Sequence, residues 1–252
     1  MVKICLIGSS GKMGRMIAGV VSNRFDCEIC AGVDISPVKY SDFEVYTKLS
    51  EIANPPDVVI DFSSPKGLDM MLDYCQDNKV PLVAATTGYS CEQVEKIKAA
   101  SIELPIFFSA NMSLGIALLS ELAQKAALVL GDQFDIEIVE RHHNQKVDAP
   151  SGTALMLADS INKARQDKYH YVYDRHSVRR KREPSEIGIH SVRGGTLPGD
   201  HEIIFAGQDE VICISHSAYS KKIFAVGAVN AALYLIGKGP GLYTVSQMLN
   251  GD

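Results

Sequence analysis

The 252-residue sequence has no strong excess of charge of either sign. We expect no stretch that approaches the roughly 20 apolar residues needed to cross a membrane. The apolar stretch between Lys3 and Gly8 is too short for the central region of a secretory signal. A formal net charge of −5 gives no general attraction to nucleic acid or to anionic lipid. We therefore expect a cytoplasmic protein that binds neither nucleic acid nor membranes and that carries its function in a local site.

The six cysteines do not have the spacing of a disulfide framework, because they are scattered through apolar or helical stretches. Cys27 and Cys30 form a C-x-x-C pair, but the segment has the pattern of a strand and no second pair of Cys or His accompanies it. A structural zinc site needs four ligands. We expect reduced thiols that pack in the core, and no metal site.

The first 110 residues alternate short apolar runs with helical patterns, which is typical of a parallel sheet built from strand-helix-strand units. Apolar side chains between Met13 and Val21 follow the spacing of an amphipathic helix, and Ser90 with Gln93 forms a capping box that opens another. We predict an α/β protein with an N-terminal Rossmann-like, doubly wound parallel sheet. Its expected strands lie at 3–8, 27–34, 57–63, 81–88 and 105–111.

The pattern changes after about residue 112. A long apolar helix at 113–130, a strand at 135–143 and a helix at 152–165 are followed by strand-like runs at 186–195, 201–207 and 210–220. Strands without intervening helices predict a second, α+β domain built on a mixed or antiparallel sheet. We expect a dinucleotide-binding domain at 1–112, completed by 219–252, and a substrate-binding and oligomerisation domain at 113–218.

A glycine-rich loop, "GSSGKMG", lies between the first expected strand and the first expected helix. Its G-x-x-G-x-x-G spacing is a variant of the dinucleotide fingerprint. Gly8 permits a tight turn, Gly11 lets the backbone approach a pyrophosphate, and Gly14 allows close packing of the helix. The amides at the helix N-terminus then face the phosphates. A plain strand-to-helix turn also uses glycine, so the loop alone leaves both interpretations open.

Asp34 strengthens the nucleotide interpretation. It ends the second expected strand 20 residues after Gly14, where an acid accepts hydrogen bonds from the adenosine ribose. The sequence predicts NADH or NADPH as cofactor and favours NADH, because Asp34 would repel a 2′-phosphate and the next residue, Ile35, cannot offset that charge. Lys12 and Lys39 are the nearest cations that could still admit NADPH.

Two histidines and a lysine lie close together in "ERHHNQKVDAPSGTAL", residues 140–155. Side chains alternate along a strand, so His142 and His143 point to opposite faces unless the chain turns. Asn144 and Gln145 supply turn chemistry, which would let His142 and Lys146 converge on one ligand. Histidine exchanges protons near neutral pH, whereas lysine mainly supplies positive charge.

A helix follows this turn. Ser151 or Gly152 caps it, and its first amides form an anion site that also meets Thr153 and Lys146. A carboxylate fits such a site. The alternative is a solvated polar turn that precedes a capped helix.

Taken in order, seven segments make the chain resemble the 4-hydroxy-tetrahydrodipicolinate reductase (dihydrodipicolinate reductase) family. The resemblance implies reduction of (2S,4S)-4-hydroxy-2,3,4,5-tetrahydrodipicolinate to tetrahydrodipicolinate with NAD(P)H, in the diaminopimelate route to lysine, by a homotetramer assembled through the second domain. The most specific segment is "HHNQKVDAPSGTA". The matching segments are "GSSGKMG", "DFSSP", "TTGY", "SANMSLG", "ERHHNQKVDAPSGTAL", "SVRGGTLPGDHEIIF" and "SHSAYSKKIFAVGAV".

The resemblance also implies roles for single residues. His142 matches a histidine that gives or takes a proton, Lys146 matches a proton-donating lysine, and His143, Gly152 and Thr153 match substrate contacts beside Ser151. The cofactor positions, with Gly14 of the glycine loop, are Gly8, Ser9, Ser10, Gly11, Lys12, Met13, Asp34, Ala85, Thr86, Thr87, Ser109, Ala110, Asn111 and Met112.

The chain departs from many members of this family at Ile35, Ala85, Asn144, Gln145 and the "SANM" segment. These differences bear on cofactor choice and on the shape of the site.

Two other functions fit the nucleotide half alone: another NAD(P)H-dependent reductase of an imine or amino acid, and a non-enzymatic nucleotide sensor. The segment expected to bind a dicarboxylate favours a 4-hydroxy-tetrahydrodipicolinate reductase over both of these alternatives. The basic run at 175–183 is expected to be a solvated loop. Arg193 could reach either a substrate carboxylate or a neighbouring subunit.

Overall fold

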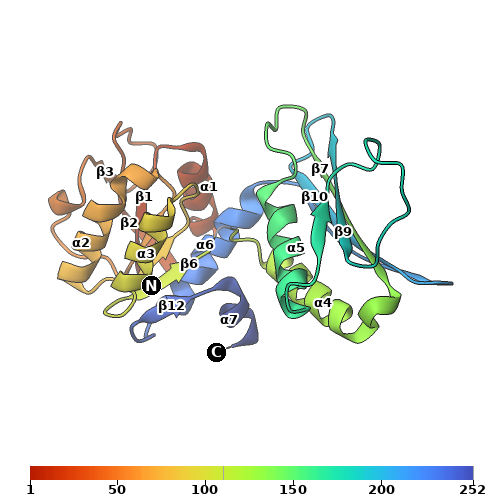
Figure 1. The fold of residues 1–252 in the computed structure, drawn as a ribbon. Helices are drawn as coiled ribbons and strands as arrows, with labels where there is room; N and C mark the ends of the chain where they lie inside the picture. Colours follow the sequence, from red (N-terminus) through yellow and green to blue (C-terminus); the bar gives the residue numbers. More distant parts are fainter. Residues whose placement is uncertain (110, 252) are drawn as a thin grey trace. The chain divides into compact units, whose positions relative to one another are not determined.

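A computed structural model describes residues 1–109 and 111–251 of the chain. It divides into two compact units, the first formed by Met1–Leu114 with Lys222–Asp252 and the second by Gly115–Lys221. The first unit thus takes its strands and helices from both ends of the chain, and the second is a single insertion between them (Figure 1).

The first unit is built on a seven-stranded sheet in the order β12-β6-β5-β4-β1-β2-β3, in which every neighbouring pair is parallel. The strand order reverses between β1 and β4, which confirms the predicted doubly wound topology. The strands are β1 Val2–Ile7, β2 Cys27–Val33, β3 Glu44–Tyr46, β4 Val58–Asp61, β5 Leu82–Ala84, β6 Pro105–Phe108 and β12 Gly241–Tyr243.

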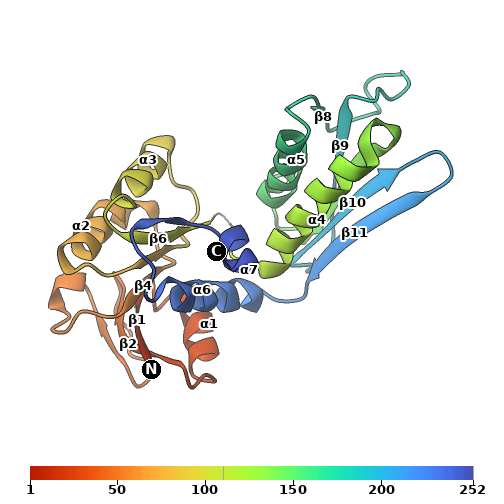
Figure 2. The same cartoon turned by 90° about the horizontal axis from the view of Figure 1, so that it is seen from below.

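Helices cover both faces of this sheet, α2 and α3 on one side and α1 and α6 on the other (Figure 2). Central strands are therefore buried on both faces, and β4 has no exposed residue. The capping box of Ser90 and Gln93 is present at the start of α3. The helices are α1 Lys12–Val21, α2 Leu68–Asn78, α3 Cys91–Ala100, α6 Lys222–Leu235 and α7 Val245–Asn250, with 3₁₀ turns at Leu49–Glu51 and Pro65–Gly67.

The second unit is built on a five-stranded mixed sheet in the order β11-β10-β7-β9-β8. Strand β7 pairs parallel to β9 and antiparallel to β10, so the predicted mixed sheet is confirmed. The elements are α4 Leu114–Leu130, a 3₁₀ turn Gly131–Gln133, β7 Asp135–His142, α5 Gly152–Ala164, β8 His170–Val172, β9 Glu186–Arg193, β10 Gly199–Ala206 and β11 Val211–Ala218.

Strand β7 separates a buried face from an open one by strict alternation. Ile136, Ile138, Glu140 and His142 point to the side where α4 and α5 enclose the core. The intervening residues, Glu137 among them, point to the opposite side, where ion pairs replace apolar packing. The buried face of β7 therefore carries apolar residues at its start and polar residues at its carboxyl end.

The segment Leu114–Gln133, which contains α4, is long and apolar enough to cross a membrane by length and composition. This finding corrects the expectation that no stretch approaches such a span. One stripe of α4 packs in the core of the second unit through Ile116, Leu119, Ala123 and Ala127. This packing is that of a core helix in a folded domain.

Candidate active site

The predicted cofactor residues gather at one edge of the seven-stranded sheet, outside the carboxyl ends of its strands. The glycine loop follows β1, Asp34 follows β2, Ala85 to Thr87 follow β5, and Ser109 to Met112 follow β6. Ala110 lies outside the described residues. In doubly wound sheets, ligands bind at this edge where the strand order reverses.

The glycine loop requires glycine at two of its three positions. Gly8 has φ +78°, and a Cβ added there would lie 2.6 Å from the Phe62 carbonyl oxygen. A Cβ on Gly14 would lie 2.3 Å from the Gly8 carbonyl oxygen, so any side chain would force the loop and α1 apart. Gly11 is the N-cap of α1 and has no side chain to satisfy the first helical amides, which are thus left for an anion.

Asp34 is tied to the glycine loop by its carboxylate. Oδ2 accepts from the backbone N–H of Ser10 at 3.0 Å, and Oδ1 accepts from that of Ser36 at 3.1 Å. Ile35, by contrast, is 99% exposed. The acid is therefore fixed beside the loop, and the next side chain is directed into solvent.

In the second unit, Glu140 and His142 form a buried pair at the carboxyl end of β7. The Glu140 side chain is completely buried, and its Oε2 lies 2.6 Å from Nδ1 of His142. His142 also meets His201 of β10 edge to face, with ring centroids 5.2 Å apart. The strand alternation predicted that His142 and His143 diverge, and His142 is buried while His143 is half-buried.

Helix α5 begins directly against this pair. Ser151 is its N-cap, and its hydroxyl accepts from the Ala154 N–H at 3.1 Å, as predicted. The Ser151 N–H donates to Glu140 Oε1 at 3.1 Å, and the Ser151 hydroxyl lies 3.1 Å from Nε2 of His201. Burial lowers the pKa of His201 to about 4, so this imidazole is neutral at pH 7.

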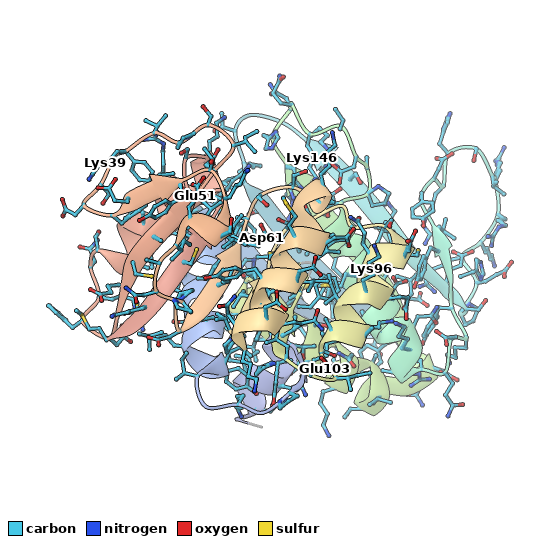
Figure 3. All side chains as sticks on the ribbon, turned by 90° about the vertical axis from the view of Figure 1, so that its left-hand side faces the viewer. Lys39, Glu51, Asp61, Lys96, Glu103 and Lys146 are labelled. Atoms are coloured by element: carbon cyan, nitrogen blue, oxygen red, sulfur yellow. The ribbon has the colours of Figure 1, made fainter. Side chains whose placement is uncertain are left out.

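Lys146 lies on the turn between β7 and α5 (Figure 3). Its Nζ is 2.8 Å from Asp148 Oδ1, and this contact lowers the pKa of the Asp148 carboxyl group. Arg193 donates to the backbone carbonyl of Asp148 at 2.6 Å and also donates to Glu140 Oε1 at 2.7 Å. Lys146, His142 and the start of α5 thus belong to one hydrogen-bonded group.

Two family models match nearly the whole chain. The model "Dihydrodipicolinate reductase, N-terminus" matches residues 2–112, and "Dihydrodipicolinate reductase, C-terminus" matches residues 115–249. The chain belongs to the dihydrodipicolinate reductase family.

Curated relatives and a solved structure agree with this assignment. A 4-hydroxy-tetrahydrodipicolinate reductase of Caldanaerobacter subterraneus subsp. tengcongensis is 49% identical, and one of Clostridium tetani is 48% identical; each alignment covers 99% of this chain and 98% of the relative. A dipicolinate-bound dihydrodipicolinate reductase from Paenisporosarcina sp. TG-14 superposes with a TM-score of 0.81 at 26% identity, over 99% of both chains. The chain is therefore a reductase, and its Rossmann-like unit indicates a nicotinamide cofactor.

This member of the dihydrodipicolinate reductase family has a buried acid at the nucleotide edge that the sequence analysis missed. Asp61, at the end of β4, accepts from the Ser63 hydroxyl at 2.5 Å and the Tyr89 hydroxyl at 3.0 Å, and burial raises its pKa (Figure 3). The Ser63 N–H donates to the Thr86 hydroxyl at 2.9 Å. Asp61 thereby holds the loop after β5, which carries three predicted cofactor residues. An acid at the end of an apolar strand was the signal available in "VVID".

A cation near Asp34 was also missed, because only Lys12 and Lys39 were singled out as candidates. Arg15 donates through Nε to the Ser10 carbonyl at 3.0 Å, and its guanidinium lies 4.3 Å above the Tyr40 ring. Lys39 instead pairs with Glu44 and points outward at the rim of the unit (Figure 3). The reductase thus holds an arginine on the same loop residue that Asp34 binds.

The basic run at 175–183 is a largely exposed loop, as predicted, and several of its arginines pair with acids. Arg175 pairs with Glu137 and Glu186, and Arg182 pairs with Glu137 and Asp135. Much of the positive charge of this segment is therefore already neutralised within the second unit.

One group of side chains in the described residues has the proximity of metal ligands. Atoms of His170, Glu183 and Glu186 lie within 4.8 Å of one another. Glu186 also pairs with Arg175 and Arg180, whose guanidinium groups lower its pKa to about 2. These guanidinium groups already neutralise the Glu186 carboxylate, which a metal ion would need as a ligand.

Proposed function

We propose that this chain reduces (2S,4S)-4-hydroxy-2,3,4,5-tetrahydrodipicolinate to tetrahydrodipicolinate with NAD(P)H, with release of water, in the diaminopimelate route to lysine. The observation that carries the proposal is the full-length match to relatives named for this reaction, at 49% and 48% identity. The arrangement of His142, Lys146 and the start of α5 supports it, because all three lie on one hydrogen-bonded group.

The substrate is a dicarboxylate, and the N-terminus of α5 suits one carboxylate. Gly152 and Thr153 open the helix, Ser151 caps it with its hydroxyl on the Ala154 N–H, and the positive end of the helix dipole therefore lies next to the turn that bears Lys146. His143 and Lys146 add polar and positive groups on the turn before the helix. We assign Ser151, Gly152, Thr153 and His143 to substrate binding.

His142 and Lys146 are assigned to proton handling. The nicotinamide supplies the hydride to an electron-poor carbon of the conjugated ring, and the charge that develops there must be quenched by a proton. Lys146 is the proton donor in this proposal, and His142 orients it or stabilises charge. Lys146 would turn from Asp148 to the substrate, whose carboxylates offer the same kind of partner.

The cofactor is assigned to the edge where the strand order of the first unit reverses. The residues fit a dinucleotide, because the glycine loop tolerates no side chain at Gly8 or Gly14 and leaves helical amides for phosphate. The cofactor positions are Gly8 to Gly14, Asp34, Ala85 to Thr87, and Ser109 to Met112. Asp34, followed by the exposed Ile35, favours NADH.

The enzyme is further proposed to be cytoplasmic, to bind neither nucleic acid nor membranes, and to assemble as a homotetramer through the sheet of the second unit. The net charge of −5 and the pairing of Arg175 and Arg182 with acids support the first part. The face of the sheet opposite α4 and α5 supports the second, since the core of the second unit lies on the other side of this sheet and much of β11 is exposed.

Replacing Lys146 or His142 with Ala tests the proposal. Because a positioned acid contributes roughly 10²- to 10⁴-fold, we expect each variant to lose a large part of kcat while the Kd for NADH stays within about twofold. Oxidation of NADH is followed at 340 nm with substrate generated by the preceding enzyme of the route. Val147→Ala is the matched control, since Val147 is a neighbour that is 97% exposed.

Loss of NADH binding with normal turnover at saturation would reject the assignment of Lys146 and His142. Failure of the unaltered chain to oxidise NADH with this substrate would reject the function itself. It would then favour another imine reductase or a nucleotide sensor.

A further inference from the structure

Glu140 is an acid with no exposed side-chain surface, a property that it shares in the described part of the second unit with Glu186. Its two oxygens contact Nδ1 of His142 at 2.6 Å, the two Nη atoms of Arg193 at 2.8 and 2.7 Å, and the Ser151 N–H at 3.1 Å, and the Ser191 side chain also bonds to this carboxyl group. A buried carboxylate is tolerated only when its charge is paired and its lone pairs are occupied. Glu140 meets both conditions.

The carboxyl group of Glu140 is ionised. Burial alone would raise its pKa, but Arg193, Ser191, His142 and the Ser151 N–H together hold it down to about 2. An ionised carboxylate only accepts hydrogen bonds, so Nδ1 of His142 must carry the hydrogen in this contact. Nε2 is then the nitrogen of His142 that remains for the reaction.

The position of Nε2 is also fixed. A Cβ added to Gly199 would lie 2.8 Å from this atom, so glycine at the start of β10 leaves the ring its space. Nδ1 is held by Glu140 on one side, and the ring edge abuts β10 on the other. The His142 ring thus has one orientation and one tautomer set by its surroundings.

We propose that Glu140 is a positioning residue of the reductase: one buried carboxylate sets the tautomer of His142 and fixes the start of α5, so that the proton-handling group and the carboxylate-binding helix keep a constant spacing. This inference rests on the proposed function. The second contact, to the Ser151 N–H, is what distinguishes it from a simple histidine-orienting acid.

Arg193 connects Glu140 to the turn that bears Lys146. It forms a bidentate pair with Glu140 and donates from Nη2 to the Asp148 carbonyl on the turn that bears Lys146. The two roles that the sequence left open for Arg193, a substrate carboxylate or a neighbouring subunit, stay predictions; within its own chain the guanidinium pairs with Glu140. Its charge neutralises Glu140, and its reach links Glu140 to the Lys146 turn.

The same strand provides a control for the proposal. Glu137, three residues earlier on the open face of β7, also contacts a histidine and arginines: His190 Nε2 at 2.7 Å, Arg182 Nε at 2.9 Å and Arg175 at 2.6 Å. It resembles Glu140 in chemistry but not in place, since it touches neither His142 nor α5. A general loss of stability from removing a glutamate of β7 should therefore appear in both variants.

Three variants test the inference: Glu140→Gln, the double variant Glu140→Gln with Arg193→Met, and Glu137→Gln. Turnover is measured with saturating NADH, Kd for NADH by fluorescence, and Tm by circular dichroism. Histidine selectively labelled with ¹⁵N reports the His142 tautomer, with His142→Gln to assign its signals. The tautomer is read in the folded protein and does not depend on turnover.

We expect the unaltered chain to hold its hydrogen on Nδ1 of His142, and Glu140→Gln to give a mixture of tautomers with kcat at least tenfold lower and Kd for NADH within twofold. The double variant should regain Tm, because no charge is left unpaired, but not kcat. Glu137→Gln should keep kcat within twofold.

Two outcomes would overturn the inference: a kcat for Glu140→Gln within twofold of the unaltered chain with an unchanged tautomer, or recovery of kcat in the double variant, which would reduce Glu140 to a partner for Arg193. If the unaltered chain fails to reduce the substrate, the proposed function fails. The tautomers of the chain and of Glu140→Gln then still decide the role of Glu140.

Discussion

Removing Arg193 should destabilise the protein far more than removing an arginine from an exposed ion pair. In Arg193→Met, Glu140 stays buried and ionised but loses both Nη contacts, at 2.8 and 2.7 Å. Breaking one partner out of a buried pair typically costs about 3–5 kcal/mol. At about 2–4 °C per kcal/mol for a chain of this size, the expected fall in Tm is about 6–20 °C.

The matched control is Arg141→Met. Arg141 lies in β7 and pairs with Glu202 at the same 2.8 Å, but the two side chains are 39% and 25% exposed. Exposed pairs contribute about 0–1 kcal/mol, so its Tm should change by no more than about 4 °C. Calorimetry at pH 7 measures both. Equal Tm values for the two variants would refute the account of Glu140 as a buried, ionised group that depends on Arg193.

The pH dependence of stability gives a second measure of the same group. The pKa of Glu140 is depressed from 4.5 to about 2, which corresponds to about 3 kcal/mol at 1.36 kcal/mol per unit. Because the folded-state pKa is the lower one, this stability is present above pH 4.5 and is lost as the pH falls from about 4.5 to 2. Arg193→Met should flatten that part of the profile, and an unchanged profile would contradict the assignment.

Two further predictions concern the cofactor and the core. Ile35→Arg should raise the ratio of kcat/KM for NADPH to kcat/KM for NADH at least tenfold, because Ile35 is 99% exposed beside Asp34 and an arginine there can bind a phosphate. Phe25→Arg is the control: Phe25 is 95% exposed and lies before the start of β2, so this variant should leave the ratio unchanged. Leu157→Ala should lower the free energy of unfolding by about 2–5 kcal/mol, since Leu157 lies on α5 and is completely buried. Leu118→Ala, at a position 50% exposed, should lower it by less than about 1 kcal/mol. Urea unfolding checks the second pair, and similar losses in both variants would contradict it.

The architecture could be predicted from local patterns in the sequence. The glycine loop before an amphipathic helix, the capping box of Ser90 and Gln93, and the alternation in "DIEIVERHH" each follow from contacts within a few residues. Such patterns can be recognised without knowing which strands pair. They were sufficient to predict a doubly wound sheet, a mixed sheet and the capped start of α5 at Ser151.

Contacts across long sequence separations were beyond this reasoning. Glu140 meets Arg193 only because β7 and β9 pair in parallel with His142 opposite Arg193, a register that no local pattern specifies. Asp61 meets Tyr89 for a similar reason, across β4 and β5. In both cases the acid was visible in the sequence, but its role depended on a partner that the fold supplies.

The two glutamates of β7 show why residue type and spacing could not decide between a structural and a functional acid. Glu137 and Glu140 are three positions apart, and because side chains alternate along a strand, they point to opposite faces of the sheet. Each nevertheless contacts a histidine and at least one arginine. On the other face, the Glu137 side chain is 20% exposed within its own chain and contacts neither His142 nor α5. On the core face, α5 excludes water, so solvent screens the Glu140 charge little and its hydrogen bonds to neighbouring groups are strengthened. It touches His142 and the amide that opens α5. Burial thus turns a common ion-pair motif into one that can govern geometry at the site, and this distinction depends on the face of the sheet rather than on the residues themselves.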